Sequence, residues 1–111
     1  MFLDALFWLI VLHFIADYQL QSDFIAANKV PGRYPAWYFV MTAHAAVHGA
    51  AVAYVLNPLF GLAEFVSHWL IDTAKSKGFM GGDSVKALWI DQTLHISLKF
   101  LWLALFFGLS S

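Results

Sequence analysis

Four long apolar stretches alternate with short segments rich in turn-forming residues. We predict helices over about residues 2–27, 36–56, 59–77 and 84–108, each long enough to approach the ~30 Å hydrocarbon core of a bilayer. The breaks between them are residues 28–35, with two prolines and one glycine, the turn at 57–58, and a glycine-rich segment at 78–82. Short connections make sequential helices antiparallel neighbours. The pattern predicts an all-α polytopic membrane protein, an antiparallel bundle of four transmembrane helices.

Histidine and acidic residues interrupt these apolar stretches at a repeated spacing of four. The pairs are His13 with Asp17, His44 with His48, Glu64 with His68, His68 with Asp72, and Asp91 with His95. Residues four apart lie on the same face of a helix. The chain has five histidines and seven acidic residues, and random placement of such a set would give about one pair at this spacing. The recurrence therefore predicts that the pairs belong to a common site.

The composition supports a lipid environment. Apolar residues make up 61% and charged residues 12% of the 111 residues, whereas soluble domains have about 45–50% and about 25%. A chain of this length is expected to form a single domain over residues 1–111. The net charge of −1 gives no basic field for nucleic acid, and the lack of cysteine excludes thiolate ligands and nucleophiles.

The basic residues indicate how the helices are oriented. With four spans, five of the six fall on the side of the 28–35 and 78–82 loops: Lys29, Arg33, Lys75, Lys77 and Lys86. The positive-inside rule puts these loops in the cytoplasm and both termini outside it. We therefore expect a multi-pass protein of the bacterial inner (cytoplasmic) membrane.

The polar pairs are predicted to share one layer of the membrane. At a rise of about 1.5 Å per residue, each lies roughly 10–17 Å from the predicted cytoplasmic face. An ionisable residue at the bilayer centre costs ~2.5–3.5 kcal/mol on insertion scales, so such residues face the bundle interior and mark functional sites. Four pairs at one depth favour an intramembrane site over four unrelated contacts.

Imidazole nitrogen and carboxylate oxygen are ligands of zinc and related divalent ions, and helix bundles build dinuclear sites from inward-facing ligands. The predicted ligands are His13, Asp17, His44, His48, His68, Asp72, Asp91 and His95. They would suffice for one or two divalent ions, with Zn²⁺ favoured. The alternative is a proton relay or a purely structural polar network.

Several other polar residues are candidates for supporting roles. Glu64 and Asp91 are the candidate catalytic proton acceptors, although Glu64 could instead be a ligand or could orient His68. Gln19, Gln21 and Gln92 are interpreted in one of two ways. They either donate hydrogen bonds to the metal ligands or are polar residues of an interface. Lys99, one turn beyond His95, is expected to extend towards the outer surface.

The order of these motifs resembles a known family over nearly the whole chain. The motifs are His13-x3-Asp17-x-Gln19-x-Gln21 with Lys29, His44-x3-His48, His68-x3-Asp72-x2-Lys75, and Asp91-Gln92-x2-His95. This order is similar to that of small bacterial and phage-borne membrane proteins grouped as domain-of-unknown-function family 3307. The resemblance implies a membrane protein and implies no particular activity.

A weaker resemblance is to the LexA-regulated, membrane-bound metal-dependent hydrolases, which also carry His and Asp on successive hydrophobic helices. Through them the chain is distantly similar to helical zinc phospholipase C and related nucleases. It departs from those soluble enzymes because it lacks their additional water-soluble part and their N-terminal tryptophan ligand. A phosphoesterase activity is thus implied by analogy of fold alone.

Two classes of function follow from these patterns. The first is a membrane-embedded metal-dependent hydrolase acting on a phosphoester or lipid-linked substrate. The second is a non-enzymatic module that handles metal ions or protons, either a transporter subunit or a phage factor acting on host membrane proteins. Four short helices leave little room for a pore in one chain, so transport would require a homo-oligomer.

Overall fold

A computed structural model of the chain describes residues 1–19, 24–25, 29, 35–76 and 85–110. Their elements are α1 (Phe2–Phe14), the π-helix η1 (Ile15–Gln19), α3 (Trp37–Val55), α4 (Pro58–Ser76) and α5 (Val85–Ser110). These residues contain four α-helices and no strand, which confirms the all-α class.

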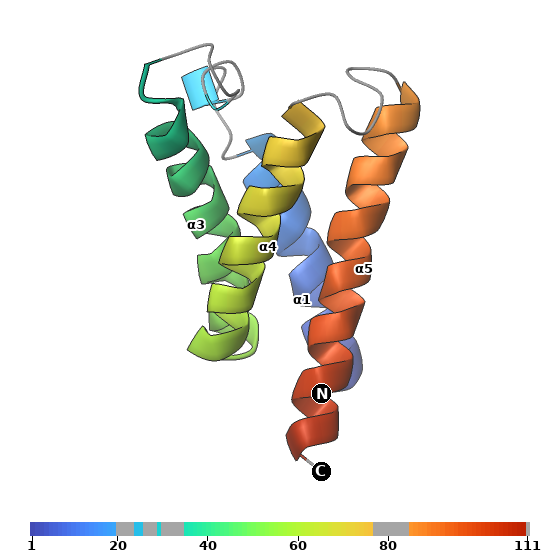
Figure 1. Ribbon diagram of the computed structural model, residues 1–111. Coiled ribbons are helices and arrows are strands. Elements are labelled where there is room, and N and C mark those ends of the chain that lie inside the picture. Colours follow the sequence, from blue (N-terminus) through green and yellow to red (C-terminus); the bar gives the residue numbers. More distant parts are fainter. Residues whose placement is uncertain (20–23, 26–28, 30–34, 77–84, 111) are drawn as a thin grey trace.

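The four helices form an antiparallel bundle in which each has two neighbours. α1 and α4 both contact α3 and α5. Figure 1 shows that the two termini lie at the same end of the bundle, as does the short turn between α3 and α4. The sequence prediction of antiparallel neighbours therefore holds for these helices.

Three of the predicted helices agree with the structure to within two residues, and the first does not. The α-helix ends at Phe14, and the next five residues form the π-turn η1, which contains Asp17. Single π-turns within helices occur frequently at functional sites. Residues 20–23, 26 and 27 of the predicted first helix lie outside the described residues.

Small residues bring α3 and α4 into close contact. A Cβ added to Gly61 would lie 2.5 Å from Ala53 Cβ and 2.7 Å from the carbonyl oxygen of Gly49. Such contacts would force the helices apart, so only glycine fits at position 61 without a shift. Close approach through small residues is typical of helix packing in membranes, where no water is expelled to drive association.

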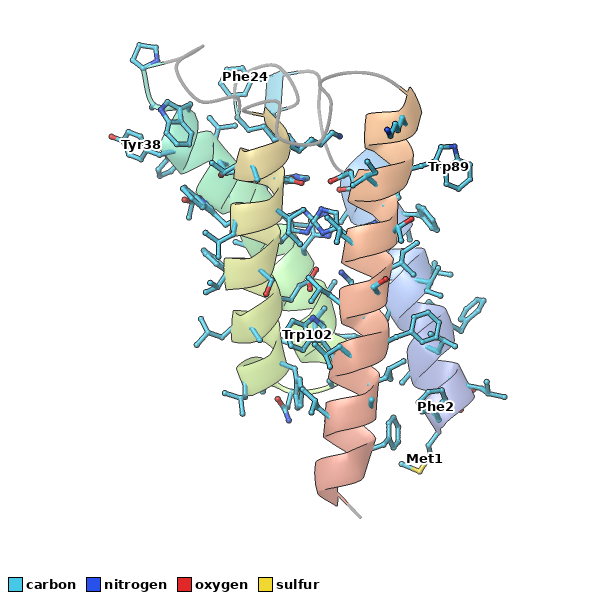
Figure 2. The ribbon with its side chains drawn as sticks, turned by 45° about the vertical axis from the view of Figure 1, so that its right-hand side comes forward. Met1, Phe2, Phe24, Tyr38, Trp89 and Trp102 are labelled. Carbon is cyan, nitrogen blue, oxygen red and sulfur yellow. The ribbon has the colours of Figure 1, made fainter. Side chains whose placement is uncertain are left out.

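A cluster of buried apolar residues lies towards the terminal end of the bundle. Leu9, Val52, Phe60, Trp102 and Leu103 are buried together there. Figure 2 shows Trp102 pointing inward between the helices, whereas Tyr38 and Trp89 point outward. The middle of the bundle is instead filled by buried polar side chains.

Two stretches of the described helices, Trp37–Val55 and Leu88–Gly108, are long and apolar enough to cross a membrane. α1 is too short by itself because the π-turn interrupts it. α4 carries the charged residues Glu64, Asp72 and Lys75 within its length. Two such helices are weak evidence of membrane association, and the four-span arrangement stays a prediction.

Candidate metal centre

All four helices and the π-turn contribute to one cluster of imidazole and carboxylate groups. Its members are His13 from α1, Asp17 from η1, His44 and His48 from α3, Glu64, His68 and Asp72 from α4, and Asp91 and His95 from α5. All are buried except Asp17, whose side chain is 13% exposed. The spacing of four therefore places each pair on the inward face of its helix, and these faces meet inside the bundle.

His44, His68 and Asp72 form a nearly equilateral triangle of ligand atoms. Asp72 Oδ2 lies 3.2 Å from the Nε2 atoms of both histidines, which are 3.4 Å from each other. Ligands about 2.0–2.2 Å from a tetrahedral zinc ion are about 3.3–3.6 Å apart. The triangle therefore has nearly the dimensions of one face of a tetrahedral site.

A second group of ligand atoms lies on the other side of the same carboxylate. Asp72 Oδ1 is 3.1 Å from His95 Nε2, which is in turn 3.2 Å from Asp91 Oδ1. Asp72, Asp91 and His95 are all buried and could together hold a metal ion. Because Asp72 faces both groups with different oxygens, it has the geometry of a carboxylate that bridges two ions.

Asp17 extends the cluster along α3. Its Oδ1 atom lies 2.9 Å from His48 Nε2 and 3.6 Å from His44 Nε2. With His68, these residues form another group able to hold a metal ion, and Glu64, His68 and His95 form a third. The groups share histidines, so they describe overlapping positions within one centre.

His13 and Gln92 lie at the edge of the cluster. His13 Nε2 is 2.9 Å from Gln92 Oε1 and 3.5 Å from Asp17 Oδ2. The Gln92 amide donates to Asp17 Oδ2 at 3.1 Å and to Asp91 Oδ2 at 3.2 Å. Gln92 thus links two of the candidate ligands, and its role in supporting them stays a prediction.

Glu64 is engaged on the side of the cluster towards the apolar core. Its carboxylate accepts a short hydrogen bond from Lys99 Nζ and a 2.8 Å hydrogen bond from Trp102 Nε1, and its Oε1 atom lies 3.5 Å from His68 Nδ1. A carboxylate beside Nδ1 orients a histidine so that Nε2 is free to coordinate. These contacts favour the orienting role for Glu64 over that of a proton acceptor.

The expectation for Lys99 was wrong. Its side chain does not extend to the outer surface but is buried, with the residue 1% exposed, in an ion pair with Glu64. A buried carboxylate on the neighbouring helix provides a stronger partner than the distant surface. The pattern of one helix alone could not indicate that partner.

Two lysines that were not predicted as site residues contact the cluster from the end opposite the termini. Lys29 Nζ lies 3.2 Å from Asp72 Oδ2, and Lys75 Nζ lies 3.4 Å from Asp91 Oδ2. Both occur in the quoted motifs, but their charges were predicted only to indicate the orientation of the helices. Gln21 and the side chain of Gln19 lie outside the described residues.

Comparisons with known proteins identify a family and nothing more specific. None of the curated proteins and none of the solved structures matches the chain. The resemblance to the LexA-regulated hydrolases has no counterpart among these findings and stays a prediction. The family described as "Protein of unknown function (DUF3307)" matches residues 5–110. The chain therefore belongs to this family.

Proposed function

We propose that this protein is a membrane-embedded metal-dependent hydrolase, with a divalent-metal centre inside the helix bundle and a phosphoester or lipid-linked substrate. The observation that carries the proposal is the position of Asp72 between two sets of ligand atoms. One of its oxygens completes a triangle with His44 and His68, and the other faces His95 and Asp91. Bridging carboxylates of this kind hold paired ions in helix-bundle enzymes.

The distribution of polar and apolar residues supports four membrane spans. Among the described residues, ten buried residues are polar or charged and nine are apolar, while 21 large apolar residues are exposed. In water this arrangement would be unstable, because burial of apolar area is the main favourable contribution to folding. In lipid it is the expected arrangement, so we take all four helices to cross the bacterial inner membrane, with both termini outside the cytoplasm.

Each part of the proposed centre has a separate role. His44, His48, His68, His95, Asp17 and Asp72 would hold one or two ions, with Zn²⁺ favoured, and His13 would support them. A bound divalent ion would supply an activated water molecule and would polarise a phosphoryl or acyl oxygen. Asp91 would accept the proton, because its Oδ2 atom is engaged by Gln92 and Lys75 while Oδ1 faces the cluster. Glu64 would orient His68.

The charge of the cluster favours an anionic substrate. Its carboxylates are Asp17, Glu64, Asp72 and Asp91, and its ammonium groups belong to Lys29, Lys75 and Lys99. With neutral imidazoles this leaves one net negative charge. Two divalent ions would convert it to a net charge of plus three, which a phosphate-bearing substrate would partly neutralise.

Elemental analysis of detergent-purified protein tests the proposal. We expect one or two divalent ions per chain in the wild type and a loss of most of this metal in the His44→Ala/His48→Ala variant. Asp4→Asn alters an exposed carboxylate near the terminal end and serves as the control. Wild-type protein without metal would contradict the metal centre. Metal without hydrolysis of any phosphoester or lipid ester in a broad panel would contradict the hydrolase.

One observation favours the alternative, a module that handles protons or metal ions without breaking bonds. A continuous series of polar contacts runs from Lys29 through Asp72, His95 and Asp91 to Lys75, with steps of 3.1–3.4 Å. Because Lys29 and Lys75 both lie at the end of the bundle opposite the termini, such a series could exchange protons with that side of the membrane, and transport across it would need a further path. Uptake of H⁺ or Zn²⁺ into proteoliposomes, abolished by His44→Ala, would support this function. A tight vesicle that shows no flux would contradict its transport form.

A further inference from the structure

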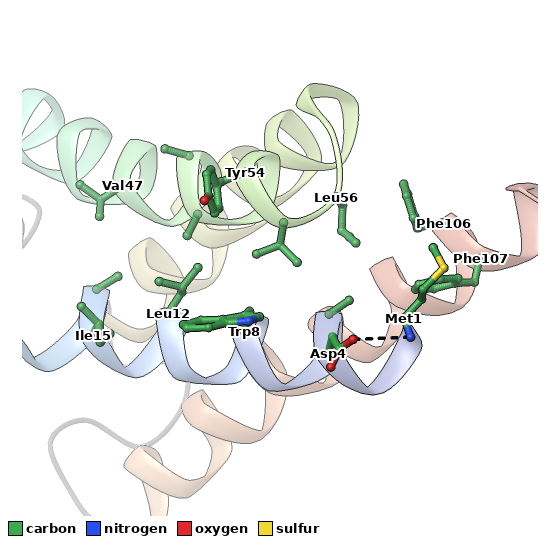
Figure 3. Close-up of a pocket in the computed structure, with 15 residues that line it drawn as sticks. Met1, Asp4, Trp8, Leu12, Ile15, Val47, Tyr54, Leu56, Phe106 and Phe107 are labelled. Atoms are coloured by element: carbon green, nitrogen blue, oxygen red, sulfur yellow. Dashed lines mark ion pairs between the residues drawn. The ribbon is translucent and has the colours of Figure 1, made fainter.

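A deep apolar groove lies between α1 and α3 (Figure 3). Its volume is about 940 Å³, and its walls are formed chiefly by Trp8, Leu12 and Ile15 on α1 and η1 and by Val47, Ala50 and Ala51 on α3. Pockets of about 300–1,000 Å³ with mostly apolar walls are typical of small-molecule sites. The groove therefore has the size and lining of a ligand site.

Small side chains on one wall create the groove. Ala50 and Ala51 on α3 line the groove opposite the large side chains of Trp8 and Leu12 on α1. Figure 3 labels Trp8 and Leu12 on their side of the groove. α3 packs closely on α4 instead, through the contact of Gly49 with Gly61. The gap is thus a consequence of how α3 is held by its other neighbour.

The groove leads to the metal centre. Ala16 lines one end and directly precedes Asp17, and Val47 lines the opposite wall and directly precedes His48. Asp17 and His48 are in contact, with Asp17 Oδ1 2.9 Å from His48 Nε2. A molecule lying in the groove would therefore present its inner end to the candidate ligands, and Asp17 is the partly exposed residue at this junction.

The other end of the groove lies near the termini. Phe106, Phe107 and the ion pair between the Met1 amino group and Asp4 lie there. From Asp4 to Ala16 the wall is about 18 Å long at 1.5 Å per residue. That is close to half of the ~30 Å hydrocarbon thickness, and so to the depth of one leaflet.

We propose that this groove binds one hydrocarbon chain of a lipid substrate whose anionic head group lies at the metal centre. The inference rests on the proposed function, because it assigns the bound hydrocarbon chain to the substrate of the proposed metal centre. The direction fits a lipid that enters from the side of Lys29 and Lys75, with its head group at the depth of the cluster, roughly 10–17 Å below that face, and its hydrocarbon chain towards the termini.

Photo-crosslinking in vesicles tests the groove without relying on catalysis. The full-length protein is placed in phosphatidylethanolamine and phosphatidylglycerol vesicles that contain a phospholipid with a diazirine midway along one chain. We expect adducts on Trp8, Leu12 and Val47 to exceed those on Leu62, Val66 and Leu70 of α4 by at least fivefold. The α4 residues are 48–61% exposed, against 51% for Trp8 and 39% for Val47, so exposure alone predicts no excess of adducts on the groove residues.

Two matched variants make the result specific. Ala50→Phe fills the groove and should lower adducts on Trp8 and Leu12 at least threefold. Ala104→Phe makes the same change at an exposed position on α5 that does not line the groove, and should leave them unchanged. Equal labelling of the two faces, or crosslinks between two protein chains, would overturn the proposal.

The two proposals fail in different ways. Metal-loaded protein that hydrolyses soluble phosphoesters but shows no preferential labelling would overturn the groove assignment and leave the hydrolase. Preferential labelling that persists in the His44→Ala/His48→Ala variant supports binding of the hydrocarbon chain in the groove, because the residues that line the groove are not candidate metal ligands. Preferential labelling of wild-type protein that binds no metal would support the groove as a lipid site and overturn the hydrolase.

Discussion

Asp72 directs its Oδ1 atom at His95 Nε2, 3.1 Å away, from the opposite side of the cluster to the α3 histidines. Its second oxygen meanwhile lies 3.2 Å from His44 Nε2. The carboxylate therefore connects ligands on α3 with ligands on α5 through a residue of α4. Asp72 is therefore central to the proposed dinuclear arrangement.

Asp72→Asn should lower the metal content of the purified protein by at least half. The amide keeps the size of the side chain but replaces one ligand oxygen by a donor and removes the negative charge that both positions share. Inductively coupled plasma mass spectrometry of detergent-purified protein measures the change. Asp4→Asn makes the same replacement at an exposed site and should retain the full content. Unchanged metal in Asp72→Asn would contradict the bridging role.

Gly61→Ala should destabilise the bundle, by about 1–3 kcal/mol as for other overpacked contacts. The new Cβ would lie 2.7 Å from the Gly49 carbonyl oxygen and 2.5 Å from Ala53 Cβ. This strain outweighs the ~1 kcal/mol by which alanine is favoured in a helix. Thermal unfolding in detergent provides the measurement. Gly108→Ala, where the added Cβ meets nothing within 4 Å, should keep or raise the melting temperature.

Much of the cluster could be predicted from the sequence, because it depends on regular helix geometry. The spacing of four fixes which residues share a face, and the rise per residue fixes their depth. Burial cost then requires the polar faces to meet. These arguments predicted that His13, His44, His68 and His95 belong to one layer, and the structure brings all four into the same cluster.

Features that depend on neighbouring helices could not be predicted in the same way. The burial of Lys99 requires Glu64 and Trp102 to be opposite it, and this follows only from how α4 and α5 pack. The π-turn at residues 15–19 has no clear sequence signal, because the same residues would also fit the regular α-helix that was predicted there. The groove likewise exists because α3 packs more closely against α4 than against α1.

The ion pair of Glu64 with Lys99 should show strong coupling in a double-mutant cycle. Lys99→Met leaves a carboxylate that is 0% exposed without its cation, and such a loss costs about 3–5 kcal/mol. Glu64→Gln/Lys99→Met removes both charges and should recover a large part of that stability. Denaturation in detergent measures the single variants Lys99→Met and Glu64→Gln and the double variant. Lys86→Met, at an exposed lysine, should have little effect, and additive losses in the double variant would contradict the pairing.

Lys29→Met should raise the affinity for divalent metal about tenfold, or ~1.4 kcal/mol. The Lys29 ammonium lies 3.2 Å from Asp72 Oδ2, so it competes with a metal ion for the same oxygen and repels the ion's charge. Titration against a chromophoric chelator compares the variant with wild type and with Lys86→Met, which should match wild type. The sign of the change is informative. A lysine that only stabilises the fold would give a lower melting temperature and unchanged affinity, whereas a competitor of the metal must give tighter binding.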